Sequence, residues 1–300
     1  RSTFVMATPT LSVIVLTQGD RPEEFRNSCE SVLAVLPARA VELVVVWNTA
    51  DLPAEPLSDL VPGGKRVELR PGRNLGIPGG RNLGAQHASA PVILFLDDDA
   101  ELLGGDLPEL IGEFDENPGL GVVALRLVDE TGHTMRRHVP RVGGRSAERP
   151  GAVAQFLGGA SLHSRAAFER VGGYAEEFVY AMEETDLALR LIDTGFTIRY
   201  EPTVRVFHPH SAPTRHAGAI ERTARNRAWL AYRNLPLPLA VTYVATWTVI
   251  TAVRNLRSPS AVMASLRGTR QGVARPVGPR RPIRWRTVWK LCRLGRPPIV

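Results

Sequence analysis

The sequence contains few cysteines and almost no lysine. Its two cysteines, Cys29 and Cys292, lie far apart and form no metal-binding or redox spacing, which excludes a disulfide framework and favours a reducing compartment. Of the 37 lysine and arginine residues, only Lys65 and Lys290 are lysine. We expect no signal peptide, because the chain passes directly into a strand pattern at 11–17.

Acidic residues are absent after Glu221. The segment from Arg222 to Val300 carries 16 basic residues, whereas the other 21 basic residues and all 30 acidic residues lie in the first 221 positions. The first part of the chain therefore has a net charge of −9 and the end a net charge of +16. An acidic body joined to a basic end indicates an anionic partner, either a membrane leaflet or a nucleic acid.

Strand and helix patterns alternate along residues 11–128 of this 300-residue chain, whose 44% hydrophobic and 22% charged residues are typical of a globular protein. The expected strands are 11–17, 41–47, 66–69, 92–96, 197–201 and 204–207. One expected helix starts near Asp20, and the others cover 80–88, 164–171 and 183–194. Residues 129–154 are expected to form a long loop or hairpin. This order predicts an α/β fold with a mostly parallel central sheet flanked by helices.

The first expected helix has a start signal and one apolar face. Asp20 can cap it, Pro22 lies in its first turn, and Glu23 completes a capping box. Apolar residues then recur at helical spacing from Phe25 to Leu36.

The chain is expected to be helical from Ala217 onward. The stretch from Leu235 to Val253 has no charge and approaches the length of a membrane span, so it either spans a membrane, lies in the membrane interface or packs on the body. The tail from Arg275 is rich in proline and arginine and is expected to be partly disordered. We therefore predict a catalytic domain at 1–215 and a basic helical region at 216–300.

Three consecutive carboxylates follow a buried strand pattern. The apolar run Val92–Leu96 leads directly into Asp97, Asp98 and Asp99. Like charges at a strand end are unfavourable unless a positive group neutralises them, and a divalent cation that carries diphosphate oxygens is one such group. The alternative is a solvated acidic turn.

A glycine-rich segment from Asn74 to Gly84 precedes the acidic strand. Its glycines allow the backbone to approach a ligand, a helix N-terminus favours an anion, and Arg81 is a fork-shaped donor suited to phosphate. The alternative is an ordinary tight turn.

Glu183 and Glu184 open the helix expected at 183–194. Glu184 shares the apolar face of that helix with Leu187 and Leu191, and partial burial would raise its pKa toward the range of a general base. Glu183 either takes part in the same site or complements the helix dipole.

Histidines follow the strand expected at 204–207. His208 stands at the strand end, where it is a candidate third metal ligand or a plain surface residue, and His210 and His216 are weaker candidates. Within the helix at 183–194, Asp186 and Arg190 are spaced to form an ion pair.

Six segments occur in one order over residues 11–210 and together resemble family 2 glycosyltransferases, including rhamnosyltransferase-like members: LSVIVLT, NLGIPGGRNLG, VILFLDDDAEL, GGASLHSRAAFERVGGYAEEF, EETDLALRL and YEPTVRVFH. The resemblance implies the GT-A nucleotide-diphospho-sugar transferase fold and a bound Mn²⁺ or Mg²⁺. It implies that the metal ligands are Asp97, Asp99 and His208, that Glu184 is the catalytic base beside Glu183, and that the nucleotide-sugar is bound by Thr17, Asn48, Asn74, Gly76, Arg81, Asp97, Asp98 and Gly159.

Two positions depart from the pattern of the family. Trp47 stands where many members have an aspartate after the second strand, so it either stacks on the base or packs in the core. Glu184 stands where aspartate is common, and its longer side chain can act as the base if the backbone lies slightly further back.

The resemblance implies an inverting transfer of a hexosyl or deoxyhexosyl group from a nucleotide-sugar donor. The basic end favours a glycan or lipid-linked acceptor in cell-surface glycan synthesis, with the enzyme cytoplasmic and peripheral on the inner face of the plasma membrane. The alternatives are a metal-dependent nucleotidyl- or phosphotransferase and, with less support, a nucleic-acid-binding protein. We expect no nucleic-acid partner, because no recognised binding module occurs in the sequence.

Overall fold

The structure, a computed structural model, describes residues 9–50, 64–141, 146–209 and 218–299. The strands are β1 (Leu11–Thr17), β2 (Val41–Trp47), β3 (Lys65–Leu69), β4 (Val92–Asp97), β5 (Glu101–Gly104), β6 (Leu120–Val128), β7 (Gly151–Val153), β8 (Ala160–Ser164) and β9 (Thr197–Phe207). The α-helices are α1 (Pro22–Leu33), α2 (Gly76–His87), α3 (Leu107–Glu116), α4 (Arg165–Arg170), α5 (Glu183–Thr194), α6 (Ala219–Asn234), α7 (Leu237–Arg254), α8 (Pro259–Ala274) and α9 (Trp285–Arg293).

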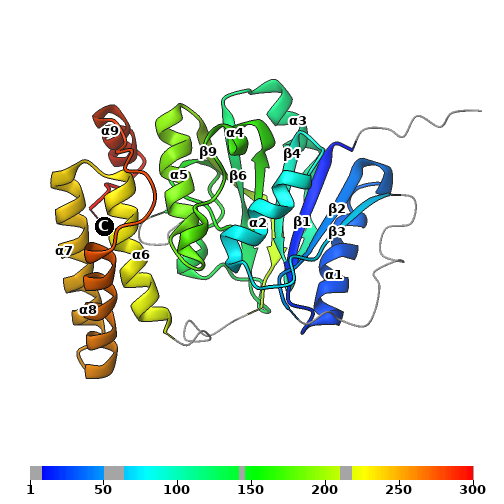
Figure 1. Ribbon diagram of the computed structural model, residues 1–300. Coiled ribbons are helices and arrows are strands. Elements are labelled where there is room, and N and C mark those ends of the chain that lie inside the picture. The colour runs from blue at the N-terminus through cyan, green and yellow to red at the C-terminus, as the bar shows by residue number, and fades with distance from the viewer. Residues whose placement is uncertain (1–8, 51–63, 142–145, 210–217, 300) are drawn as a thin grey trace, which may run out of the picture.

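These strands form one mixed sheet in the order β3-β2-β1-β4-β8-β6-β9-β5, with β7 paired to β9 (Figure 1). The half from β3 to β4 is parallel, as predicted, and β6 is parallel to β9. The expectation of a mostly parallel sheet is corrected in the other half, because β8 runs antiparallel to both β4 and β6, and β5 and β7 run antiparallel to β9. Strand β5 follows β4 after a short turn but pairs with β9, and β8 lies between β4 and β6, so no βαβ crossover fixes the direction of these strands.

Alternation of side chains along the strands gives the sheet two buried faces. Val13 and Val15 of β1 face a core shared with α1 and α3. Ile14 faces the opposite core, which contains residues of α2, α4, α5 and α6. The predicted arrangement of helices on both faces is therefore confirmed.

Helix α2 starts at Gly76, four residues before the predicted start at 80. Glycines weaken helix propensity, so the local pattern did not indicate the first turn. Packing explains why they are present: a Cβ on Gly80 would lie 2.2 Å from the Leu16 side chain, and one on Gly84 would lie 2.5 Å from Ile14. The glycines thus allow α2 to lie directly on β1.

Two local predictions need correction. Helix α1 begins at Pro22 with Arg21 as its N-cap residue and no side-chain cap, so Asp20 and Glu23 do not form the predicted capping box. The two strands expected at 197–201 and 204–207 are one strand, β9, whose pairing with β6 shifts register where Pro202 interrupts it.

The C-terminal helical region, residues 218–299, packs on the sheet domain through α6 (Figure 1). Helix α9 lies within the tail that was expected to be partly disordered. The tail is tied to the body, because Ile283 N donates to Asn234 O at 2.8 Å and the Thr287 hydroxyl donates to Asp193 at 2.6 Å. The predicted domain boundary at 215/216 and the candidates His210 and His216 lie outside the described residues.

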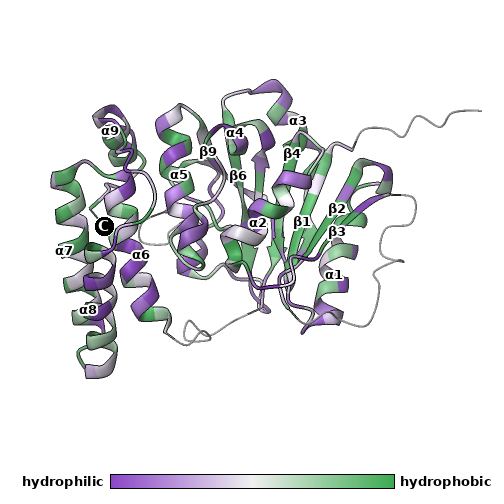
Figure 2. Cartoon of the chain, in the orientation of Figure 1, coloured by the Kyte–Doolittle hydropathy of each residue, from purple (hydrophilic) through white to green (hydrophobic). Residues whose placement is uncertain are grey.

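Among the described residues, α7 is the one helix whose length and composition would allow it to cross a membrane. Tyr243 packs inward among the buried residues, whereas Val241, Val249 and Val253 are exposed, and Figure 2 shows a mostly hydrophobic α7. Helix α7 therefore packs on the body with one face and presents apolar side chains with another.

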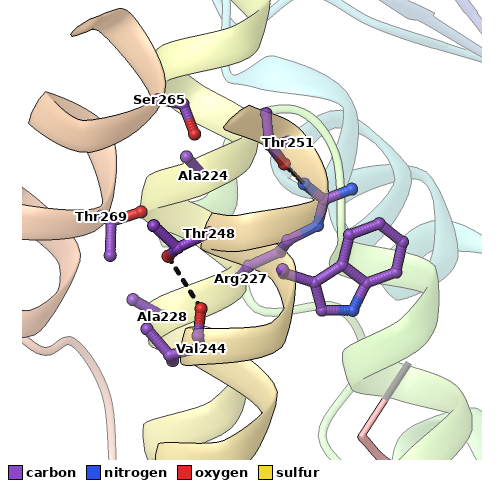
Figure 3. A pocket seen from close by; sticks show the side chains of 9 residues that line it. Ala224, Arg227, Ala228, Val244, Thr248, Thr251, Ser265 and Thr269 are labelled. Atoms are coloured by element: carbon purple, nitrogen blue, oxygen red, sulfur yellow. Dashed lines mark hydrogen bonds between the residues drawn. The ribbon is translucent and has the colours of Figure 1, made fainter. Parts of the chain in front are cut away.

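A cavity of about 10 Å³ lies between α6, α7 and α8 (Figure 3). Arg227 lies beside it, with its guanidinium 3.9 Å from the Trp247 ring centroid and 3.4 Å from the Thr251 hydroxyl that accepts its hydrogen bond. This volume has room for about one water molecule. The cavity is therefore too small for a substrate.

A buried carboxylate connects the first three strands. Glu42 on β2 has no exposed surface, and it accepts hydrogen bonds from Ser12 at 2.5 Å and from Ser89 N at 2.6 Å and pairs with Lys65 Nζ at 2.6 Å. Burial alone would raise the pKa of Glu42, but Lys65 and the hydroxyl and amide donors outweigh it and hold that pKa below its usual range.

Glu42→Gln should lower the free energy of unfolding by about 1–3 kcal/mol, because it removes a charged acceptor from these bonds. Because the pKa of Glu42 is lower in the folded protein, its carboxylate contributes fully to stability at pH values above the unfolded pKa of about 4.3. This contribution is lost as the pH falls through the lower pKa of the folded state. Denaturant unfolding of both proteins from pH 7 to pH 3 measures this.

Glu68→Gln is the matched control for that measurement. Glu68 on β3 is more exposed and pairs with Arg66 and Arg70, so its loss should change stability by less than about 1 kcal/mol. A Glu42→Gln effect that did not shrink toward pH 3 would contradict the role assigned to the ionised carboxylate.

Candidate active site

Three potential metal ligands gather at one end of the sheet. Asp97 ends β4, Asp99 lies in the turn that follows, and His208 follows β9. Strand β5 brings them together, because Glu101 pairs opposite Phe207, the neighbour of His208. One ligand atom from each of these three side chains lies within 4.8 Å of the others.

The donor set fits a divalent cation. His208 Nε2 is 3.6 Å from Asp97 Oδ2 and 3.5 Å from Asp99 Oδ1. Two carboxylates and an imidazole are ligands that Mn²⁺ accepts. The three residues that the sequence nominated as metal ligands are therefore brought to one place.

Two arginines neutralise the acidic turn. Arg21, which precedes α1, pairs with Asp99 and donates to Asp98 at 2.6 Å, and Arg81 on α2 donates to Asp97 at 2.9 Å. Sequence reasoning missed Arg21, because the pattern around it pointed to a helix cap and its partners lie 77 and 78 residues away.

The surroundings move the pKa values of these groups in different directions. Burial would raise the pKa of Asp97, but His208 and Arg81 outweigh it and hold that pKa well below its usual range. Burial raises the pKa of Asp98 to about 6 against the opposing effects of Thr17 and Arg21. Burial would lower the pKa of His208, but Asp97 and Asp99 raise it to about 9.

The paired glutamates lie at the start of α5 in different environments. Glu183 is 2% exposed and its Oε2 atom is buried without a hydrogen bond. The Glu184 side chain is 25% exposed, and its Oε1 lies 3.7 Å from Arg81 Nη1. Burial raises the pKa of both groups, and Arg81 opposes the rise at Glu184. Of the two carboxyl groups, Glu183 is therefore the one on which burial favours a proton.

Arg81 links the metal-ligand cluster to the glutamates. Its guanidinium contacts both Asp97 and Glu184, and it lies over the rings of Phe95 and Tyr174 at 5.9 and 5.8 Å. The residue is only 4% exposed. Protein carboxylates and aromatic rings thus surround its guanidinium, and the role of Arg81 in donor binding stays a prediction.

The glycine pair Gly158 and Gly159 lies against the same groups. A Cβ on Gly159 would lie 1.9 Å from Asp97 Oδ2, and a Cβ on Gly158 would lie 2.0 Å from Arg81 Nη1 and 2.9 Å from Glu184 Oε1. These positions require glycine because the carboxylates and the guanidinium occupy the space that a side chain would need.

Asn48 and Asn74, the predicted donor-binding asparagines, join in a network at the start of α2. Asn48 accepts from Leu75 N at 2.7 Å and donates to Asn74 and to Gly76 O, and Asn74 accepts from Gly76 N at 2.8 Å. The Thr17 hydroxyl, at the end of β1, forms a hydrogen bond with the Asp98 side chain and accepts one from Gly19 N. The structure thus brings Thr17 to the acidic turn and uses the two asparagines to shape the turn before α2.

Trp47 packs rather than projecting into the site. It is 3% exposed, belongs to the core cluster of α1 and lies 5.9 Å from the Phe25 ring. Of the two interpretations of this position, the structure supports packing in the core.

A central sheet between two helical layers, with an acidic turn at the end of a strand, is the arrangement of GT-A glycosyltransferases. The crystal structure of GalNAc-T7 with UDP, GalNAc and Mn²⁺ superposes with a TM-score of 0.60 at 15% identity, over 90% of this chain and 55% of that one. The mannosyltransferase PcManGT of Pyrobaculum calidifontis with GDP-Man and Mn²⁺ gives 0.56 at 18% identity, over 90% and 76%. The predicted fold class is confirmed.

The family profile of Glycosyl transferase family 2 matches residues 12–172, and the chain belongs to this family. The pre-mycofactocin glycosyltransferase of Mycobacterium tuberculosis is 29% identical over 264 residues, which cover 82% of this chain and 55% of the relative. The chain thus spans about half the length of that relative. The resemblance inferred from six short segments is confirmed.

Mn²⁺ should raise the melting temperature of the protein, because a ligand that binds only the native state stabilises it. Asp99→Ala should weaken Mn²⁺ binding more than about tenfold by removing one of three ligands, while relieving carboxylate repulsion. A thermal-shift titration with MnCl₂ measures both effects. Glu109→Gln, which removes an exposed acid from α3, should behave as wild type. An equal Mn²⁺ response in the Asp99→Ala protein would rule out this metal site.

Proposed function

We propose that this protein is a metal-dependent inverting glycosyltransferase, which moves a hexosyl or deoxyhexosyl group from a nucleotide-diphosphate sugar to an acceptor hydroxyl. One observation carries the proposal: Asp97, Asp99 and His208 meet at one point, and Arg81 joins Asp97 to the carboxylate of Glu184. A site for a diphosphate-bound cation and a partly exposed base thus adjoin each other. The nucleotide-sugar complexes of proteins with the same fold support the choice of donor.

Each residue of the cluster has a separate task in this proposal. Asp97, Asp99 and His208 hold a divalent cation, which when bound neutralises charge on the diphosphate leaving group. Arg21 and Arg81 limit repulsion among the carboxylates and keep them in place. Thr17 and Asp98 contact the nucleotide part of the donor in this proposal.

Glu184 acts as the general base. Its carboxylate accepts the proton of the acceptor hydroxyl while the acceptor oxygen forms a bond to the anomeric carbon. The bond from that carbon to the diphosphate oxygen breaks, and its electron pair leaves with the nucleoside diphosphate. A single displacement inverts the anomeric centre, so the protein supplies no covalent nucleophile.

Glu184→Gln should keep donor and Mn²⁺ binding and lower turnover by about 10²–10⁴-fold, because the amide cannot accept the proton. Glu183→Gln is the matched neighbour and should lower turnover less, since burial favours the protonated form of this carboxyl group, which the amide resembles. Chromatographic analysis of the products, with a panel of nucleotide sugars, measures transfer and identifies the donor. The reverse ranking of the two variants would assign the base to Glu183, and transfer of a nucleotidyl or phosphoryl group would contradict the proposed reaction.

The C-terminal helical region supports a membrane-associated acceptor, such as a lipid-linked glycan in cell-surface synthesis. Ten of the twelve exposed large apolar side chains in the described residues lie between Leu237 and Trp289. All 16 basic residues after Glu221 belong to the C-terminal helical region and its last residues, which contain no acid from Arg222 on. Exposed apolar side chains combined with positive charge are typical of proteins that bind anionic bilayer surfaces peripherally.

Vesicle binding should rise with the fraction of anionic lipid and weaken with salt. Replacing Trp285 and Trp289 of α9 by serine should weaken binding roughly tenfold or more, because the two exposed rings would no longer enter the interface. Leu103→Ser, which removes an exposed apolar side chain from β5, should bind as wild type. Co-sedimentation with neutral and anionic vesicles distinguishes the outcomes, and equal binding to both would contradict the electrostatic contribution.

A further inference from the structure

The segment 178–182, just before the paired glutamates, has an unusual backbone. Val179, Ala181 and Met182 have φ values of 61°, 69° and 75°. They are three of the four non-glycine residues with positive φ in the described part of the chain. A residue with a Cβ adopts this conformation only where its surroundings hold it there, and such positions concentrate at functional sites.

One side chain holds most of this segment. The Asn226 amide nitrogen on α6 donates to Phe178 O at 2.9 Å, to Tyr180 O at 2.8 Å and to Ala181 O at 2.9 Å. Asn226 is fully buried, and its oxygen accepts from Arg225 Nε at 3.1 Å, which directs the amide hydrogens toward the carbonyls. Three acceptors thus share the hydrogens of a single amide.

The other carbonyls of the segment connect it to the active site. Val179 O accepts from Ile77 N in the first turn of α2, the helix that carries Arg81. Gly76 lies against the same point, because a Cβ there would be 2.7 Å from Val179 O. Met182 O accepts from Asp186 N in the first turn of α5. The segment is therefore held between α6, α2 and the helix that begins with Glu183 and Glu184.

A second contact fixes α6 to α5. Asp186 has no exposed surface and accepts from Arg233 Nε at 2.9 Å and from Asn234 Nδ2 at 2.6 Å, besides pairing with Arg190 at 2.6 Å. Because both ends of this contact are buried, α6 cannot shift relative to α5 without leaving the carboxylate unpaired.

We propose that Asn226 is a positioning residue for catalysis: it holds the strained segment 178–182 so that Glu184 faces Arg81 and the metal-ligand cluster. Helix α6 would then be part of the catalytic unit rather than only a link to the membrane-binding helices. The inference rests on the proposed function for its kinetic consequence, whereas the effect on the segment itself can be measured without activity.

Asn226→Ala should lower kcat about 10–100-fold, because a displacement of about 1 Å in a catalytic group has effects of this size. The KM for the donor and the response to Mn²⁺ should stay within about twofold of wild type, since the metal ligands belong to other elements. Asn226→Ser keeps one donor and should give an intermediate kcat, so it decides the question if the alanine variant does not fold. Asn226→Asp keeps the shape without the amide and should be at least as impaired as alanine.

Arg280→Ala is the matched control. Arg280 donates to Tyr232 O and Leu235 O at the other end of α6, so its loss weakens the same helical region without contacting segment 178–182. Its kcat should stay within about twofold of wild type at a temperature where circular dichroism shows both variants folded.

Hydrogen exchange of the Val179–Glu184 amides provides the readout that is independent of transfer. Exchange should be faster in Asn226→Ala than in Arg280→Ala. Unchanged exchange, or a kcat loss no larger than that of Arg280→Ala, would overturn the inference about Asn226. Absence of transfer by the wild-type protein, with faster exchange in Asn226→Ala, would overturn the proposed reaction and leave the contact itself established.

Discussion

Like-charge repulsion is the constraint that organises the active site. Five carboxylates, those of Asp97, Asp98, Asp99, Glu183 and Glu184, lie between the end of β4 and the start of α5, and ionised together they would repel one another strongly. Arg81 is the group on which the arrangement depends, because it is buried and reaches both Asp97 and Glu184. It holds the cluster of Asp97, Asp99 and His208 next to the Glu184 carboxylate and lowers the electrostatic energy of both.

The five carboxylates differ in how their negative charge is neutralised. Arg21 pairs with Asp98 and Asp99, and His208 lies within 3.6 Å of Asp97 and Asp99. At Glu183, burial and the neighbouring Glu184 raise the pKa more than Arg81 lowers it, so the protonated form is favoured. A protein that keeps one member of a pair neutral can hold the other charged at a working pH, which is how acid and base roles are separated in many active sites.

The acidic turn and the glutamate at the start of α5 could be predicted from the sequence, because their signals are local. The run from Asp97 to Asp99 follows a strand pattern directly, and Glu184 opens a helix whose apolar spacing is plain. Arg21 and Asn226 carry no such signal, because each acts on residues more than 40 positions away that only the fold brings near. The early start of α2 escaped prediction for a related reason: its glycines serve contact with β1 and weaken the helix pattern.

The burial of Asp186 between Arg190, Arg233 and Asn234 bears on how the chain can be divided. By composition the chain changes character near residue 216, yet the partners of this carboxylate come from both sides of that point. A protein cut there would retain the buried charge of Asp186 without Arg233 and Asn234, and the carbonyls of Phe178, Tyr180 and Ala181 would lose the Asn226 amide. The sheet domain and α6 are therefore joined by buried polar contacts, so a cut near residue 216 would separate groups that compensate one another.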